Sequence, residues 1–300
     1  MTMTMTAEEV SPAGAKGRVR ESQPVRLVCS EIWGGNQPIL TPIELPGVRG
    51  MLFSHACDGG RGGDVHYLSV CGTGLLSRMC LADVVGHGET VAAVSGEMHT
   101  HLRRCMNTPD QRRVLRKLNR RLERLGLKAM TTAALATYYA PTRRLTVSYA
   151  GHPPGWLYRR SQRRWSRLAL DQPAEETGSM TDMPLAVWDD VSYSRKAVRV
   201  AEGDQLILLT DGVLEALDAD GRQLGDDRIG ALLEQHSQAS CDQIMEAVLT
   251  SLCEHVGNCE LSHDDVSLLV VEFGPGPSSP ALWMAVKHRI MRPRGNSGSV

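Results

Sequence analysis

The sequence has almost no excess charge of either sign. Its 33 lysines and arginines nearly balance 34 aspartates and glutamates, which leaves a formal net charge of −1. A protein with this balance has no overall field that would draw it to nucleic acid or to an anionic membrane surface. We therefore expect neither nucleic acid nor a membrane as a partner.

Long apolar runs are also missing. No stretch approaches the roughly 20 apolar residues that a helix needs to cross a bilayer. The first residues, MTMTMTAEEVSPAGAKGR, lack the apolar core of a signal peptide. These two absences predict a cytoplasmic protein.

Several common motifs are absent or incomplete. None of the eight cysteines is spaced CxxC, so a zinc ribbon or thiol redox site is not indicated, and we expect mostly reduced structural thiols. No GxxxxGK[ST] sequence is present, which excludes a P-loop. GHGETV at 86–91 imitates a dinucleotide-binding GxGxxG motif. Val91 takes the place of its third glycine, however, and no βαβ unit follows.

The chain between residues 25 and 273 has the pattern of one globular domain, with flexible tails at 1–24 and 274–300. Apolar alternation and turn signals predict strands at 26–34, 47–57, 65–71, 78–85, 130–140, 144–150, 155–160, 164–170, 191–200, 205–210 and 265–273. Helical periodicity predicts helices at 89–106, 109–125, 227–237 and 240–256. This order is not a regular βαβ alternation. It predicts an α+β fold in which packed antiparallel sheets are flanked by helix pairs.

Acidic residues recur at the ends of predicted strands, next to glycines. Asp64 follows the glycine run GGRGG, Asp83 ends the strand in LADVVGHG, and Asp211 follows ILLT. Asp264 and Asp265 directly precede the apolar run VSLLVVE. Carboxylates in apolar surroundings are costly unless they are paired or bind a metal. Their oxygen ligands favour Mg²⁺ or Mn²⁺ over zinc.

Five short motifs in the chain resemble those of a known family. They are GGD at 62–64, DVVGHG at 83–88, AGHPP at 150–154, LLTDGVLEA at 208–216 and DDVSLLVVE at 264–272. They occur in the order found in metal-dependent protein phosphatases of the PPM (type 2C) class. The bacterial SpoIIE/RsbU-like branch of that class is the most similar. The resemblance covers about residues 45–273.

The resemblance implies an antiparallel β-sandwich with two Mn²⁺ or Mg²⁺ ions at one end. By motif, the implied metal-binding residues are Asp64, Asp83, Asp211 and Asp264, with Asp265 as the second half of its pair and Val84 through its backbone carbonyl. In this chemistry a metal-activated water attacks a phosphoserine or phosphothreonine phosphorus. No cysteine is then needed as a nucleophile.

Other residues near these motifs admit two interpretations each. His87 acts as the general acid or only shapes its turn; with Asp83 and Asp211 it forms the predicted catalytic group. Arg61 binds the substrate phosphate or is a solvated loop arginine. We expect His152 to be structural. Glu215 either favours the helix dipole or helps to organise the metal site.

One position departs from the family pattern. The motif GGD is usually followed, after two residues, by a second aspartate, and Tyr67 stands there in this chain. This loss of a carboxylate keeps an alternative open, in which the protein is a catalytically weak pseudophosphatase that binds phosphoproteins as a regulator. A metal-dependent hydrolase of small phosphates is a further alternative.

Residues 103–128 hold ten lysines or arginines and two acids, Asp110 and Glu123. Such a cluster is either a solvated helix face or a docking surface for an acidic partner protein. It lacks the interleaved aromatic residues of a nucleic-acid site. By the resemblance, the substrate is a phosphorylated protein, with an anti-sigma-factor antagonist in bacterial partner switching as the favoured example. An activating partner protein or a homodimer would supply regulation, and the segment 281–291 is a candidate docking helix.

Overall fold

The computed structural model describes residues 25–26, 31–35, 39–57, 62–71, 73–86, 89–105, 107–171, 180–258, 261 and 264–276. The predicted tail at 1–24, most of the tail at 274–300 and the candidate helix at 281–291 lie outside these residues. No helix in these ranges is long and apolar enough to span a membrane.

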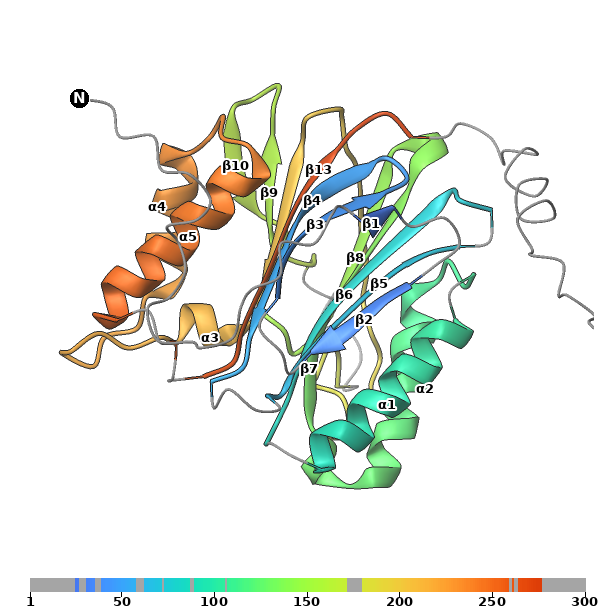
Figure 1. Ribbon diagram of the computed structural model, residues 1–300. Coiled ribbons are helices and arrows are strands. Elements are labelled where there is room, and N and C mark those ends of the chain that lie inside the picture. Colours follow the sequence, from blue (N-terminus) through green and yellow to red (C-terminus); the bar gives the residue numbers. More distant parts are fainter. Residues whose placement is uncertain are drawn as a thin grey trace, which may run out of the picture.

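The strands form two sheets that face each other (Figure 1). In spatial order, the first contains β1 (Val25–Arg26), β3 (Ile39–Leu45), β4 (Val48–His55), β13 (Val266–Phe273), β12 (Gln205–Leu209), β9 (Trp156–Arg159) and β10 (Arg164–Arg167). The second contains β11 (Lys196–Arg199), β8 (Arg144–Ala150), β7 (Thr131–Tyr139), β6 (Leu76–Val84), β5 (Asp64–Val70) and β2 (Glu31–Gly35). All neighbouring strands are antiparallel except β1 and β3.

Helix pairs cover the outer faces of both sheets (Figure 1). Helices α1 (Glu89–Arg104) and α2 (Gln111–Leu122) pack on the second sheet, and α4 (Gly225–Gln235) and α5 (Cys241–Val256) pack on the first. A short helix, α3 (Asp211–Leu214), follows β12. The predicted α+β sandwich flanked by helix pairs is therefore confirmed.

Strand β13 shows why its sequence is continuously apolar. Leu269 and Val271 pack between the two sheets, whereas Leu268 and Val270 pack against the outer helices. A strand covered on both faces needs apolar residues at every position. The same alternation in β6 directs Leu81 into the sandwich and its neighbours toward α1 and α2.

The connection between α1 and α2 is anchored by Arg78 of β6. This side chain is fully buried and donates hydrogen bonds to the carbonyl oxygens of Cys105 and Thr108. The first of these carbonyls belongs to the end of α1, where unpaired C=O groups need donors. The helix pair is thereby tied to the strand that carries Asp83.

Some predicted boundaries are wrong. The predicted strand at 26–34 is two strands in different sheets, β1 and β2. Strand β3 was not predicted, because Pro42 interrupts the strand pattern there. Helix α2 begins at Gln111 rather than at Pro109, because the side chain of Asp110 accepts a hydrogen bond from Arg112 N and caps it.

Two further predictions need adjustment. Of the predicted strand at 191–200, only β11 forms a ladder. Cys253 takes part in a disulfide, contrary to the expectation of reduced thiols. Among the described residues the free thiols are Cys57, Cys71, Cys80, Cys105 and Cys241.

Strand β4 has no room for a side chain at Gly50. A Cβ there would collide with the carbonyl oxygen of Val270 and lie 2.7 Å from the Cα of Val271. We expect Gly50→Ala to lower the free energy of unfolding by about 2 kcal/mol through overpacking. Urea denaturation measures this loss. The matched control is Gly96→Ala in α1, where no atom lies within 4 Å of the added Cβ; it should gain about 0.5–1 kcal/mol. Equal effects of the two substitutions would contradict the packing argument.

Candidate metal and phosphate site

Two carboxylates lie opposite each other where β5 begins and β6 ends. The antiparallel register pairs Asp64 with Asp83. Asp64 is 2% exposed and Asp83 is half-buried. Like charges at directly opposed positions of a strand pair repel each other. This end of the sheet therefore needs a proton, strong hydrogen-bond donors or a cation.

Thr210 joins this pair to the first sheet. Its buried hydroxyl donates to Asp64 Oδ2 at 2.8 Å and accepts from Ser267 N at 2.9 Å. Its own N–H donates to Ser267 O at 3.0 Å. Thr210 thus fixes one oxygen of Asp64 and also fixes the start of α3, where the next residue is Asp211.

The pair Asp264–Asp265 reaches the site from the start of β13. Asp265 is buried, and its two carboxylate oxygens accept hydrogen bonds from Cys57 N and Gly63 N. Asp264 is exposed, and its Oδ1 accepts from Asp265 N at 2.8 Å. Asp265 therefore holds the glycine turn before β5, while Asp264 is the more accessible carboxylate.

The glycines in these motifs are needed because a side chain there would overlap neighbouring atoms. A Cβ on Gly63 would collide with the carbonyl oxygen of Val84 and lie 2.9 Å from Asp83 Oδ1. A Cβ on Gly62 would overlap the Asp265 carboxylate, and one on Gly212 would overlap the Asp265 carbonyl. The absence of side chains at these three positions lets carboxylates and a backbone carbonyl from separate segments approach one another.

The crowding of acidic groups perturbs their titration. Burial raises the pKa of Asp83 to about 7, and the negative charges of Asp211, Asp264, Asp265 and Glu215 add to the shift. Burial and the charge of Asp83 raise the pKa of Asp64 well above its usual value, although hydrogen bonds from Ser267 and Thr210 oppose the shift. Carboxylates contributed by both sheets are thus close enough to destabilise one another's charge.

This arrangement fits a cation. Asp64 Oδ1 is buried and has no hydrogen-bond partner. The nearby donor atoms are carboxylate and carbonyl oxygens, the ligand type that Mg²⁺ and Mn²⁺ prefer. Within the described ranges, no three His, Cys, Asp or Glu side chains already converge to metal-binding geometry. Cation binding would therefore require side-chain adjustment among the carboxylates.

Tyr67 does not point toward these carboxylates. It is fully buried in the cluster between the second sheet and α1, and its hydroxyl donates to Glu31 Oε2 at 3.1 Å. The other oxygen of Glu31 lies 3.2 Å from His99 Nε2 and 3.3 Å from Arg103 Nε on α1. Tyr67, which stands where the family has its second aspartate, thus contributes to the contact between β2 and α1. Sequence reasoning missed Glu31, which no motif marks.

His152 lies just after β8 and is buried. The ring is buried, its Nδ1 lies 2.9 Å from the carbonyl oxygen of Pro153, and burial lowers its pKa to about 4. It is therefore neutral near pH 7. Glu215 is exposed just after α3, where its N–H donates to Asp211 O. Arg61 and His87 lie outside the described residues, so their predicted roles stay predictions.

Thr210 and Ser267 are site residues that sequence analysis did not identify. Thr210 had a usable signal, because it is a hydroxyl residue placed between the apolar run LILL and Asp211. Ser267 had a weaker one, since it is the polar residue in an otherwise apolar strand start.

The raised pKa of Asp83 leads to a testable dependence of stability on pH. An acid whose pKa is raised on folding destabilises the folded state as pH rises from its unfolded pKa, near 4, to its folded pKa. In EDTA, Asp83→Asn should therefore become more stabilising between pH 4 and pH 7 and then level off, at on the order of 3–4 kcal/mol. Urea titrations of both proteins across this range measure it. The exposed control Asp242→Asn should show no such trend, and a pH-independent gain from Asp83→Asn would contradict the assignment.

Comparisons with known proteins agree with this architecture. Residues 77–274 match the family model described as stage II sporulation protein E (SpoIIE). A relative, the phosphoserine phosphatase RsbU of Bacillus subtilis (strain 168), is 26% identical over 198 residues, which are 65% of this chain and 55% of that protein. This chain thus spans about half of that relative's length.

Solved structures share the fold. A structure of the RsbU and RsbW domains of a Mycobacterium tuberculosis protein superimposes with a TM-score of 0.63 and 22% identity, covering 80% of this chain and 64% of that one. A structure of RsbX in complex with magnesium gives a TM-score of 0.56 and 16% identity, covering 79% and 100%. Because the SpoIIE family model matches about two thirds of the sequence, the chain belongs to the SpoIIE family.

Proposed function

We propose that this protein is a metal-dependent phosphatase that hydrolyses phosphoserine or phosphothreonine in a protein substrate, with residues 25–273 as its phosphatase domain. The observation that carries the proposal is the buried, unpartnered Asp64 Oδ1 facing Asp83 in a group of mutually repelling carboxylates. Similarity to the phosphoserine phosphatase RsbU supports the choice of substrate class.

The proposed ligands are the carboxylates of Asp64, Asp83, Asp211 and Asp264 and the carbonyl of Val84. Asp265 completes the set, although both its oxygens already accept main-chain hydrogen bonds. Two Mg²⁺ or Mn²⁺ ions bound there would supply an activated water nucleophile and neutralise charge on the phosphoryl group. The structure of RsbX with magnesium supports this class of ion.

The chain's own residues have distinct tasks in this proposal. Thr210 orients Asp64 by donating to Oδ2, so that Oδ1 is directed to the ligand. The glycines at 62 and 63 let the Asp265 carboxylate and the Val84 carbonyl approach the turn closely, which keeps the proposed ligands together. Asp83 must lose its proton for cation binding, which makes cation affinity fall below about pH 7. His87 as proton donor to the leaving oxygen and Arg61 as phosphate ligand complete the proposal.

The proposed surface for binding a partner protein lies on α2. Its apolar side chains Val114, Leu115, Leu118 and Leu122 are buried. Arg116 and Arg120 lie on its exposed side. Since α1 starts directly after the DVVGHG turn, a protein bound to this helix pair would lie close to the site. We assign to this face an acidic phosphoprotein partner, such as an anti-sigma-factor antagonist.

The pseudophosphatase alternative has lost part of its support. It rested on Tyr67 in place of a second aspartate, but Tyr67 packs under α1, on the side of β5 away from the carboxylates. An inactive, folded protein at every metal concentration would restore that alternative.

The proposed function predicts metal-dependent turnover. Hydrolysis of para-nitrophenyl phosphate and of a phosphothreonine peptide should require Mn²⁺ or Mg²⁺ and stop in EDTA. Asp211→Ala should reduce kcat/KM on the order of a hundredfold or more, since it removes a group acting at the reacting centre. The control is Asp242→Ala at the start of α5, which lies far from the carboxylates. The neighbouring Cys241 Sγ contacts Arg49 O, at the end of β4 opposite to the one beside Asp265. Loss of activity in both variants would contradict the assignment.

The exposed arginines of α2 should affect partner binding but not the hydrolysis step. Arg116→Glu with Arg120→Glu should weaken dephosphorylation of an acidic phosphoprotein by about tenfold, because charge complementarity mainly affects association. Hydrolysis of the small aryl phosphate should be unchanged. The matched control replaces both residues by lysine, which keeps the charge. An equal loss on both substrates would rule out a docking role for this face.

A further inference from the structure

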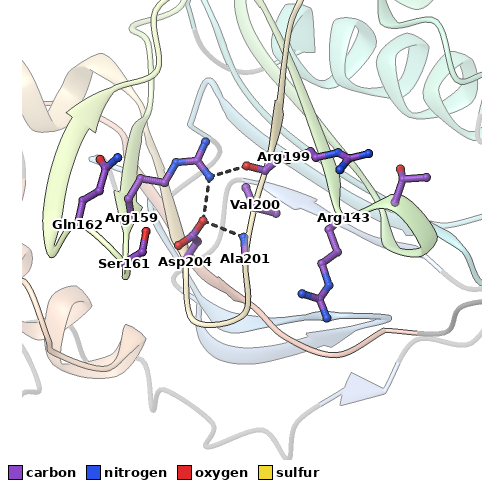
Figure 2. A pocket seen from close by; sticks show the side chains of 9 residues that line it. Arg143, Arg159, Ser161, Gln162, Arg199, Val200, Ala201 and Asp204 are labelled. Atoms are coloured by element: carbon purple, nitrogen blue, oxygen red, sulfur yellow. Dashed lines mark hydrogen bonds and ion pairs between the residues drawn. The ribbon is translucent and has the colours of Figure 1, made fainter.

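A cavity lies at the end of the sandwich away from the carboxylates. It has a volume of about 540 Å³ and is bordered by the turns 140–144, 159–164 and 199–204 (Figure 2). Strand β12 starts beside this cavity and leads to Asp211 at the other end. At the rise of a β-strand, the two sites are roughly 20 Å apart. The cavity is therefore not part of the proposed phosphatase site.

Positive charge is concentrated around this cavity, although the whole chain is nearly neutral. The three turns contain seven arginines and two carboxylates, those of Glu202 and Asp204. The arginines are Arg143, Arg144, Arg159, Arg160, Arg163, Arg164 and Arg199. These segments therefore carry five more positive than negative charges, and three of the arginines, Arg143, Arg159 and Arg199, line the cavity.

Strand register brings some of these arginines directly opposite one another. Arg199 of β11 pairs with Arg144 of β8, and Arg164 of β10 pairs with Arg159 of β9. Like charges at such positions destabilise a sheet. An anion bound between such arginines would replace their repulsion by attraction, because both guanidinium groups are attracted to it.

One arginine of the cavity is held in a fixed position. Arg159 donates to Asp204 Oδ2 at 2.9 Å and to the carbonyl oxygen of Arg199 (Figure 2). Asp204 is 1% exposed and also accepts hydrogen bonds from Arg160 N and Ala201 N. A guanidinium ordered in this way loses less conformational entropy when it binds an anion.

Two turn arginines adopt a backbone conformation that usually calls for glycine. Arg143 has a φ of 51° and Arg163 a φ of 50°. Such left-handed residues are strained unless they are glycine, and strain of this kind concentrates at functional sites. Arg143 lines the cavity, and Val200 N donates to its carbonyl oxygen.

We propose that this cavity binds an oligophosphate anion. Arg143, Arg159 and Arg199 border it with the hydroxyls of Thr142 and Ser161, all of which can donate hydrogen bonds to phosphate oxygens. Among the described residues that line the cavity none is aromatic, so these residues offer no surface for stacking a nucleobase. The ligand is therefore recognised by its phosphate groups.

Protection of sheet edges explains only part of this pattern. β10 and β11 are edge strands, and charged side chains on edges prevent pairing with other chains. That role accounts for Arg164 and Arg199. It does not account for Arg143 and Arg163, which lie in turns and carry strained backbone.

Calorimetric titration of sodium tripolyphosphate into the full chain in EDTA tests the proposal. Without metal, the carboxylate site repels phosphate and adds no signal. Tripolyphosphate should bind more tightly than orthophosphate and less tightly as salt is raised. ATP should bind no more tightly than tripolyphosphate, since the lining offers no ring.

Matched variants locate the binding. Arg143→Gly with Arg199→Ala should weaken binding about tenfold or more through loss of charge-assisted hydrogen bonds. The melting temperature should not fall, because glycine relieves the strained φ at 143. The control Arg113→Ala with Lys117→Ala removes two exposed cations from α2 and should leave binding unchanged. Absence of binding heat, or equal weakening by both pairs, would overturn the proposal whether or not the protein is a phosphatase.

Discussion

The repulsion between Asp64 and Asp83 determines how this end of the sandwich is built. Two acidic residues opposite each other on paired strands, one of them almost fully buried, are unfavourable alone. The fold reduces the penalty with hydrogen bonds, including that from Thr210 to Asp64. The remaining unpartnered oxygen leaves a deficit that an external positive charge can remove. Under the proposed function, this local loss of stability is the cost of a cation site, as is common at functional sites.

The two sheets contribute to this arrangement in different ways. The second sheet supplies the opposed pair from β5 and β6, and the first supplies Asp211 and Asp264 from segments that flank β12 and β13. Neither sheet alone assembles the group. The hydroxyl of Thr210 accepts from Ser267 in the first sheet and donates to Asp64 in the second, so sheet packing and site geometry depend on each other.

Sequence patterns predicted the layers of the fold and the segments that carry the carboxylates. This succeeded because apolar runs such as LLVV are buried on both faces, and because glycine next to aspartate has a local steric cause. Contacts between distant segments were not predictable. The hydrogen bond from the Thr210 hydroxyl to Asp64 joins residues 146 positions apart. Glu31 of β2 contacts Tyr67, His99 and Arg103, which are likewise distant in the sequence. Pro42 concealed β3, since proline is unusual within a ladder.

The clearance around Gly62, Gly63 and Gly212 has a consequence for comparing sequences. Asp83, Asp211 and Asp264 are not fully buried, and a partly exposed carboxylate can be kept in a chain whose site has rearranged. A side chain at any of these three positions would instead collide with Asp265 or with the carbonyl of Val84. Retention of the glycines is therefore a stricter criterion than retention of the aspartates for judging whether a divergent homologue preserves this geometry.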